Sequence, residues 1–209
     1  MATISRTARI RNPALFICDL QEKFRTAIYE FPKIITTTTK LLRATAPLKT
    51  PIYITTQSAT KLGPTVPELT PYLTSPTANI AANVDKTLFS MITPEIDAVL
   101  PNPATTGGVL DAIIVGIETH ICVTQTTLDL LDRGHRVYVV VDGVSSVNAE
   151  ERGVALQRLR DAGAVVTTSE SLLFEMLGDA GHEHFRAVSG VVRETKEETR
   201  GALEALAKI

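Results

Sequence analysis

Short apolar runs of strand length alternate with segments of helical period along most of this chain, and this alternation limits the folds that it can adopt. The apolar runs cover residues 14–19, 51–56, 81–85, 112–117, 137–141 and 164–168. Helical periodicity covers residues 31–46, 122–133, 149–162 and 171–177. Parallel strands joined by crossover helices produce this pattern. We therefore predict an α/β fold, in which residues 112–117, apolar on both faces, form a central strand.

The length of the chain favours one domain. Its 209 residues fit a single large domain, so we expect one domain over 1–209. The core is expected at about 12–180, followed by a charged helical tail at 182–209. The segment 58–76 is rich in proline, which predicts a long loop with one helical turn, and loops of this length are often functional.

The charge of the chain argues against polyanionic partners. A formal net charge of -2 offers no basic surface to nucleic acid or anionic lipid. No G-x-G-x-x-G or P-loop motif is present to indicate a nucleotide cofactor. We therefore expect a small-molecule substrate, no cofactor, no nucleic acid and no membrane.

The ends of the chain bear on its location. The first residues lack the apolar segment of a secretory signal, and no apolar run reaches the roughly 18–20 residues that span a bilayer. These features predict a cytoplasmic protein. The last three residues, Ala207, Lys208 and Ile209, resemble a degenerate form of the peroxisomal address Ser-Lys-Leu; an ordinary helix end is the alternative.

Polar side chains stand at the ends of three predicted strands. Asp19 ends the first, Lys86 follows the weak strand at 81–85, and Cys122 opens the helix after the central strand. Ligands of open parallel sheets bind outside the carboxyl ends of the strands. A thiol at a helix N-terminus faces unpaired N–H groups and the positive end of the dipole, which favour the thiolate. The three residues would supply a nucleophile, a base and a cation.

Each of these residues also has a structural alternative. Asp19 could cap the following turn, Lys86 could pair with Glu95 at the surface, and Cys122 could be a small core residue. A redox sensor would also use a reactive Cys122, but Cys18 lies inside the first strand and offers no resolving partner. Neither cysteine belongs to a C-x-x-C motif, so no zinc site or disulfide is expected.

A family resemblance rests on three motifs. The stretches are CDLQEKFR at 18–25, DKTLFSM at 85–91 and GIETHICVTQTTLDLLDRG at 116–134, and the likeness continues at 62–69, 140–146 and 177–188. Together they resemble the isochorismatase-like hydrolases, specifically their ISOC-domain branch. The resemblance implies a three-layer αβα sandwich around a mainly parallel sheet of about six strands. It also implies self-association, as a dimer or a tetramer.

The same resemblance assigns roles to individual residues. Asp19, Lys86 and Cys122 match the family's catalytic triad, with Cys122 as the nucleophile. A non-proline cis peptide is implied between Ile117 and Glu118. The backbone N–H groups of Glu118 and Cys122 would then form the oxyanion hole.

The family acts on nicotinamide, N-carbamoylsarcosine, ureidoacrylate and isochorismate, so the fold alone does not fix the substrate. The stretch TTQSATKLGPT at 55–65 contains no Asp or His, unlike the metal site of nicotinamidases. His182 and His184 stand two apart, which would turn them to different faces of a helix and away from a shared metal. We expect a metal-independent amidase-type hydrolase of a small amide or ureido C–N bond, acting through a thioester. A non-catalytic binding protein of the same fold is the alternative.

The walls of the substrate pocket are expected from position in the sequence. The candidates are Phe24, Gln57, Leu88, Phe89 and His120. Where other members of the branch have Glu-Gln-Tyr after the second strand, this chain has Thr-Gln-Ser at 56–58, which changes the pocket rim. Apolar residues near the tail could line a subunit interface or pack the last helix; they are Phe174, Met176, Leu177 and Phe185.

Overall fold

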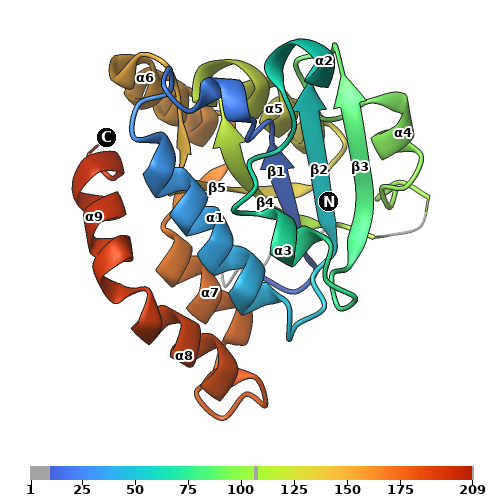
Figure 1. Ribbon diagram of the computed structural model, residues 1–209. Coiled ribbons are helices and arrows are strands. Elements are labelled where there is room, and N and C mark those ends of the chain that lie inside the picture. The colour runs from blue at the N-terminus through green and yellow to red at the C-terminus, as the bar shows by residue number, and fades with distance from the viewer. Residues whose placement is uncertain (1–9, 106–107, 209) are drawn as a thin grey trace.

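A six-stranded parallel sheet forms the middle of the protein in the computed structural model, which describes residues 10–105 and 108–208 (Figure 1). The strand order is β3-β2-β1-β4-β5-β6, and every neighbouring pair is parallel. The strands are β1 Pro13–Cys18, β2 Ile52–Gln57, β3 Ile80–Lys86, β4 Asp111–Ile117, β5 Arg136–Ser145 and β6 Val165–Thr167. The predicted α/β fold is confirmed, and each predicted apolar run contains a strand.

Helices cover both faces of the sheet and complete the three-layer sandwich. The longer ones are α1 Phe31–Thr45, α5 Thr124–Asp132, α6 Ala149–Asp161, α7 Ser169–Leu177, α8 Phe185–Glu194 and α9 Lys196–Leu206. The shorter elements are the 3-10 turn η1 Glu22–Phe24, α2 Ala59–Leu62, α3 Thr70–Leu73, α4 Pro94–Asp97 and the π-helical turn η2 Thr119–Val123. Helices α1, α7, α8 and α9 lie on one face, and α5 and α6 lie on the other (Figure 1).

The segment 58–76 is more ordered than a loop with one helical turn. It contains both α2 and α3. Pro71 stands in the first turn of α3, where a missing backbone N–H costs nothing, so a proline there starts a helix instead of breaking it. The buried side chain of Gln21 donates to the backbone oxygens of Gln57 and Gly63, at 3.2 and 2.7 Å. This clamp holds the start of the segment against the end of β1.

The alternation of side chains along β1 decides which residues face the site. Leu15 and Ile17 pack in the core beneath α1, whereas Ala14, Phe16 and Cys18 pack in the core beneath α5 and α6. Successive side chains of a strand point to opposite faces, so this division follows from the sequence position alone. Cys18 consequently lies on the same side of the sheet as η2 and α5.

Gly116 lets β4 approach the end of β1 closely. Its φ is 116°, and a Cβ built there would lie 2.0 Å from the backbone oxygen of Cys18. No side chain fits in that space. The residue pairs with Cys18 in the parallel register, and the register of β4 against β5 shifts at the same point. The glycine thus shapes the backbone beneath the predicted nucleophile.

The tail is attached to the core through buried polar groups. Lys40 in α1 donates to Thr199 in α9 at 2.9 Å, and Arg152 in α6 donates to the backbone oxygen of Leu206 at 2.8 Å. The charged helical tail is therefore partly buried, since Thr199 is only 7% exposed. Among the described residues no helix is both long and apolar enough to cross a membrane. Ile209, the last residue of the possible peroxisomal signal, lies outside the described residues.

Candidate active site

The carboxyl ends of β1, β3 and β4 bring Asp19, Lys86 and Cys122 together. Asp19 follows β1, Lys86 ends β3, and Cys122 lies in η2 after β4. The side chains of Lys86 and Asp19 are 1% and 2% exposed, and Lys86 Nζ donates to Asp19 Oδ2 at 2.7 Å. A buried charge requires such a partner. The alternative pairing of Lys86 with Glu95 is wrong, because Glu95 is exposed in α4.

The protein uses all three N–H donors of Lys86. Besides Asp19, Nζ donates to Gln57 Oε1 at 2.7 Å and to the backbone oxygen of Phe89 at 3.1 Å. An ammonium group has three donors and no acceptor. Lys86 therefore holds the carboxylate of Asp19 and has no N–H left for a ligand.

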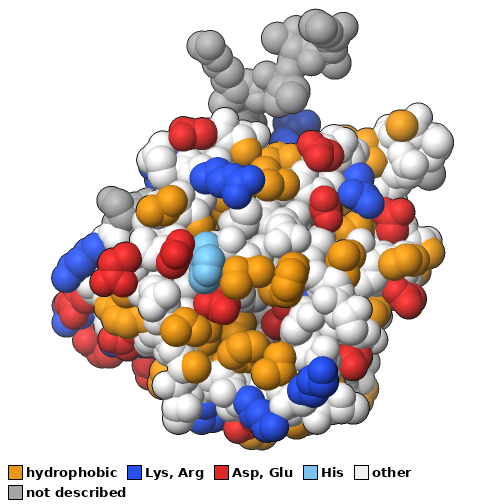
Figure 2. Space-filling model, turned by 90° about the horizontal axis from the view of Figure 1, so that it is seen from above, with side chains coloured by type: hydrophobic (Ala, Val, Ile, Leu, Met, Phe, Trp, Pro, Cys, Tyr) orange, Lys and Arg blue, Asp and Glu red, His pale blue; other side chains and the backbone are white. Residues whose placement is uncertain are grey.

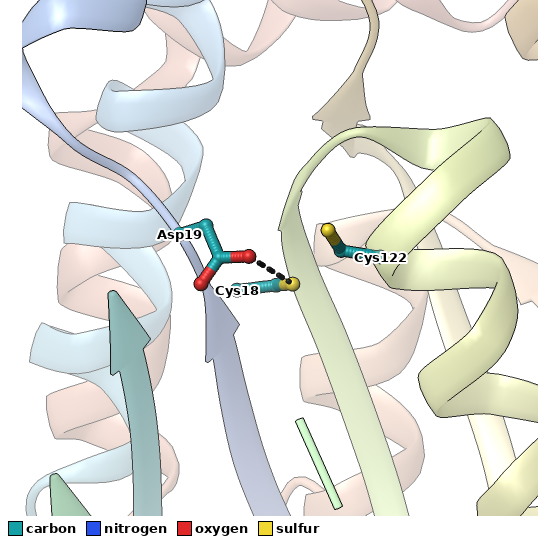
Figure 3. A group of neighbouring side chains, drawn as sticks. All are labelled: Cys18, Asp19 and Cys122. Carbon is teal, nitrogen blue, oxygen red and sulfur yellow. Dashed lines mark hydrogen bonds between the residues drawn. The ribbon is translucent and has the colours of Figure 1, made fainter. Parts of the chain in front are cut away.

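A left-handed backbone turns Asp19 into the site. Its φ is 50°, a conformation that residues other than glycine rarely adopt. Asp19 therefore does not continue the alternation of β1: Cys18 Sγ donates to its Oδ2 at 3.6 Å (Figure 3). Thr55 Oγ1 donates to the other carboxylate oxygen at 2.8 Å. The carboxylate is fixed through both oxygens beside Cys122, instead of capping the next turn.

Cys122 lies in a π-helical turn. The prediction that a helix begins at Cys122 is wrong, because helical structure starts with Thr119–Val123 and becomes α-helical at Thr124. The wider turn is visible in the bond from the Val123 N–H to the oxygen of Glu118 at 3.1 Å. Hydrophobic periodicity does not distinguish a π turn from an α turn. Cys122 itself is 7% exposed.

Two features fix the chain around Cys122. The peptide bond between Ile117 and Glu118 is cis, at the position that the resemblance implies. Thr126 Oγ1 donates to the backbone oxygen of Cys122 at 2.6 Å and accepts the Met91 N–H at 2.9 Å. The motif at 85–91 is thereby joined to the motif at 116–134.

A cavity of about 200 Å³ opens over Cys122. Its lining residues are Asp19, Phe24, Gln57, Leu62, Phe89, Ile117, Glu118, Ile121 and Cys122. Figure 2 looks onto this end of the sheet and shows hydrophobic side chains gathered in the middle of the face.

The five expected wall residues divide into two groups. Phe24, Gln57 and Phe89 line the cavity. Leu88 lies outside it, in a neighbouring hollow, and the His120 ring bonds Ser146 Oγ at 3.0 Å. Three further apolar residues line the cavity that were not among the candidates: Leu62 at the end of α2, Ile117 at the end of β4 and Ile121 in η2.

The sequence of this chain matches one family over most of its length. The family profile described as "Isochorismatase domain" covers residues 13–171. The chain belongs to the isochorismatase family. The fold of this family supports a hydrolytic function.

Relatives with about 40% sequence identity to this chain occur in organisms that are only distantly related to one another. "Isochorismatase domain-containing protein 2" of Xenopus laevis is 40% identical, over 93% of this chain and 91% of the relative. "Secreted isochorismatase effector Isc1" of Phytophthora sojae is 41% identical, over 86% and 84%. The solved "MAR1 Ribonuclease" of Caenorhabditis elegans is 43% identical, with a TM-score of 0.81 over 89% of this chain and 93% of that one.

The polar side chains of Gln57 and Glu118, which line the cavity, already form hydrogen bonds with other groups of the protein. Gln57 accepts from Lys86 and donates through Nε2 to the backbone oxygen of Thr87 at 2.9 Å. Glu118 Oε2 accepts the Val147 N–H at 2.9 Å. The remaining walls are largely apolar, so the cavity suits a ligand that forms few hydrogen bonds with its walls.

The prediction that Cys18 offers no partner to Cys122 is wrong. Cys18 does lie in β1, but its side chain is on the η2 side of the sheet. Sγ of Cys18, a carboxylate oxygen of Asp19 and Sγ of Cys122 all lie within 4.8 Å of one another. Burial raises the pKa of the Cys18 thiol well above its ordinary value, and the hydrogen bond with Cys122 and the charge of Asp19 add to this shift.

The same three residues are the group in the described part of the chain that has the spacing of metal ligands. Asp19, however, already accepts from the Lys86 ammonium at 2.7 Å, and that positive charge opposes a cation.

The expectation that His182 and His184 lie on different faces of a helix is wrong. His182 and His184 occupy the turn before α8, with ring centroids 5.5 Å apart.

Proposed function

We propose that this protein is a metal-independent cysteine hydrolase that cleaves the C–N bond of a small uncharged amide, or of a ureido analogue, through a thioester on Cys122. The proposal rests on the observation that Cys122 and Asp19 line the same cavity, while the Lys86 ammonium, which does not line it, donates to Asp19. A nucleophile beside a positioned base is the arrangement that covalent hydrolysis requires.

The proposed reaction has two halves. Cys122 Sγ attacks the carbonyl carbon while Asp19 accepts the thiol proton. Asp19 then delivers that proton to the nitrogen, the C–N bond breaks and ammonia or an amine leaves. Water next attacks the thioester while Asp19 accepts its proton, and Asp19 returns that proton to the Cys122 sulfur as the C–S bond breaks, which releases the acid and the thiol. The backbone N–H groups of Glu118 and Cys122 would stabilise the oxyanion of both tetrahedral intermediates.

Lys86 acts through Asp19 in this scheme. Its three donors are bound to protein acceptors, so it does not protonate the leaving group. Its ammonium group instead holds the carboxylate of Asp19 in place through the 2.7 Å hydrogen bond. Gln57 supports the same arrangement by accepting one of the lysine N–H groups.

The cavity favours an apolar acyl group. Phe24, Leu62, Phe89 and Ile121 supply apolar walls, and the described lining contains no basic side chain. A substrate carboxylate would be desolvated there without a counter-ion, which is costly. The volume of about 200 Å³ is below the usual range of drug-sized sites, so the substrate is small.

The cavity does not favour RNA as a substrate, although the C. elegans relative is titled a ribonuclease. Binding to nucleic acid depends on basic groups that neutralise phosphates. The charged side chains in the described lining are the acids Asp19 and Glu118, and the formal net charge of the chain is -2. Both features repel a phosphodiester.

The test is a screen of small primary amides, paired with analogues that carry an added carboxylate, together with a ureido compound and a short RNA. We expect release of ammonia from uncharged amides, and an acyl adduct on Cys122 after an acid quench. Cys122→Ala should abolish both signals, whereas Leu88→Ala, which changes a side chain outside the cavity, should retain them. Binding without turnover that Cys122→Ala leaves unaltered would instead support the non-catalytic alternative, and cleavage of RNA alone would refute the proposal.

A further inference from the structure

A second thiol lies beside the proposed nucleophile, and the proposed hydrolysis does not use it. Cys18 is the last residue of β1 and is fully buried. Figure 3 shows its side chain extending from β1 toward the side chain of Cys122, which comes from η2. The two sulfurs lie within 4.8 Å of each other, and both cysteines are free thiols.

The two thiols differ in access. Cys122 lines the cavity, whereas Cys18 is 0% exposed and does not contribute to the described lining. A small reagent that enters the cavity therefore meets Cys122 first. Burial also raises the pKa of Cys18, which keeps it as a thiol and protects it from direct oxidation, because the thiolate is the form that oxidants attack.

We propose that Cys18 is the resolving thiol of Cys122: a small hydroperoxide oxidises Cys122 to a sulfenic acid, and Cys18 converts this group into a Cys18–Cys122 disulfide. The disulfide removes the nucleophile, so any hydrolysis that depends on Cys122 stops until a thiol reductant restores it. Only this last consequence rests on the proposed function.

The chemistry balances without another reactant. In the first step the Cys122 sulfur attacks the peroxide, an S–O bond forms, the O–O bond breaks, and the thiol proton moves to the departing oxygen, so that the hydroperoxide is reduced to an alcohol or to water. In the second step Cys18 attacks the oxidised sulfur, an S–S bond forms, the S–O bond breaks and water leaves. Asp19 Oδ2, 3.6 Å from Cys18 Sγ, accepts the Cys18 proton and passes it to the departing hydroxide.

Asp19 overcomes the main obstacle to the second step. A thiol with a raised pKa attacks slowly unless a base removes its proton. The carboxylate that accepts the Cys18 S–H is also fixed by Lys86 and Thr55, so the base is already in position. Fast closure of the disulfide would prevent the irreversible oxidation of Cys122 to a sulfinic acid.

The experiment treats the full chain with hydrogen peroxide and follows intact mass under non-reducing conditions. In the wild type we expect a loss of two hydrogens, reversed by dithiothreitol, and a Cys18–Cys122 linked peptide after digestion with free thiols blocked. In Cys18→Ala we expect no such linkage; the protein should gain one oxygen, bind dimedone, and then gain a second oxygen that dithiothreitol does not remove. Cys18→Ser serves as a second variant if the alanine protein is poorly folded.

Three outcomes would overturn the proposal. The first is that sulfinic acid forms in the wild type as fast as in Cys18→Ala. The second is a disulfide that joins the Cys122 residues of two chains. The third is that peroxide leaves the mass of the wild type unchanged under conditions that oxidise Cys18→Ala. These readouts do not require turnover of an amide. If no amide is hydrolysed but the disulfide still forms, the proposed function is wrong and the inference about Cys18 stands.

Discussion

The buried ion pair between Lys86 and Asp19 is expected to stabilise the fold as well as to serve the site. Lys86→Met keeps most of the side-chain volume but leaves the carboxylate of Asp19 buried without its cation. It also removes the donor to Gln57 and Phe89. Loss of one partner of a buried pair costs about 3–5 kcal/mol, because the remaining charge is uncompensated. Asp19→Asn leaves the ammonium in the corresponding position and should cost a similar amount.

Removing both charges should cost less than the sum of the two single changes. We expect the double variant Lys86→Met/Asp19→Asn to show a coupling energy of about 2 kcal/mol. The assay is unfolding in urea, with the slope of the transition checked for constancy across the four proteins.

An exposed ion pair provides the control. Arg25 Nη1 and Glu68 Oε1 lie 2.8 Å apart, but their side chains are 34% and 45% exposed. Arg25→Met should therefore cost less than about 1 kcal/mol. If Lys86→Met costs no more than Arg25→Met, or if the costs at Lys86 and Asp19 add within about 0.5 kcal/mol, burial does not strengthen the ion pair between Lys86 and Asp19.

Two further predictions concern stability. Gly116→Ala should destabilise the fold by more than about 3 kcal/mol, because its Cβ would lie 2.0 Å from the backbone oxygen of Cys18. In the same urea assay Gly153→Ala in α6, which has open space around it, should raise the free energy of unfolding by about 0.5–1 kcal/mol. Burial lowers the pKa of Lys40 below 10.5, so the unfolded chain binds the proton more strongly and wild-type stability rises with pH in the window that ends at 10.5. Thermal unfolding at several pH values should show that the stability of Lys40→Met relative to the wild type falls as the pH rises toward 10.5; a constant difference would contradict the assignment.

The fold could be predicted from the sequence because it depends on patterns that the chain repeats. Each apolar run became a strand, and parallel connectivity followed from the helices between the runs. The placement of Asp19, Lys86 and Cys122 at one edge also followed, since the carboxyl ends of parallel strands meet there. These are consequences of period and topology, which a single sequence displays.

The contact between Cys18 and Cys122 could not be predicted in the same way. Strand alternation places Cys18 and Asp19 on opposite faces, and only the left-handed backbone of Asp19 brings both to Cys122. A positive φ is uncommon even at aspartate, and the sequence does not mark the aspartate at which it occurs. The division of the pocket candidates has a related cause, because the direction of Leu88 and Phe89 is set by a turn after β3 and not by a periodic element.

Cys122 is proposed to be a nucleophile, supported by Asp19 and Lys86, in a largely apolar cavity whose described lining holds acidic but no basic side chains. The most direct measurement compares alkylation by neutral iodoacetamide with alkylation by anionic iodoacetate, followed by intact mass and peptide mapping. Each rate is divided by the rate for glutathione with the same reagent. The wild type is compared with Asp19→Asn and Lys86→Met, each shown to be folded.

We expect one fast adduct on Cys122 and a changed rate in both variants. The normalised rate should be at least about tenfold higher for iodoacetamide than for iodoacetate, which corresponds to about 1.4 kcal/mol. Equal normalised rates for the two reagents, or slow labelling that neither variant alters, would contradict these expectations.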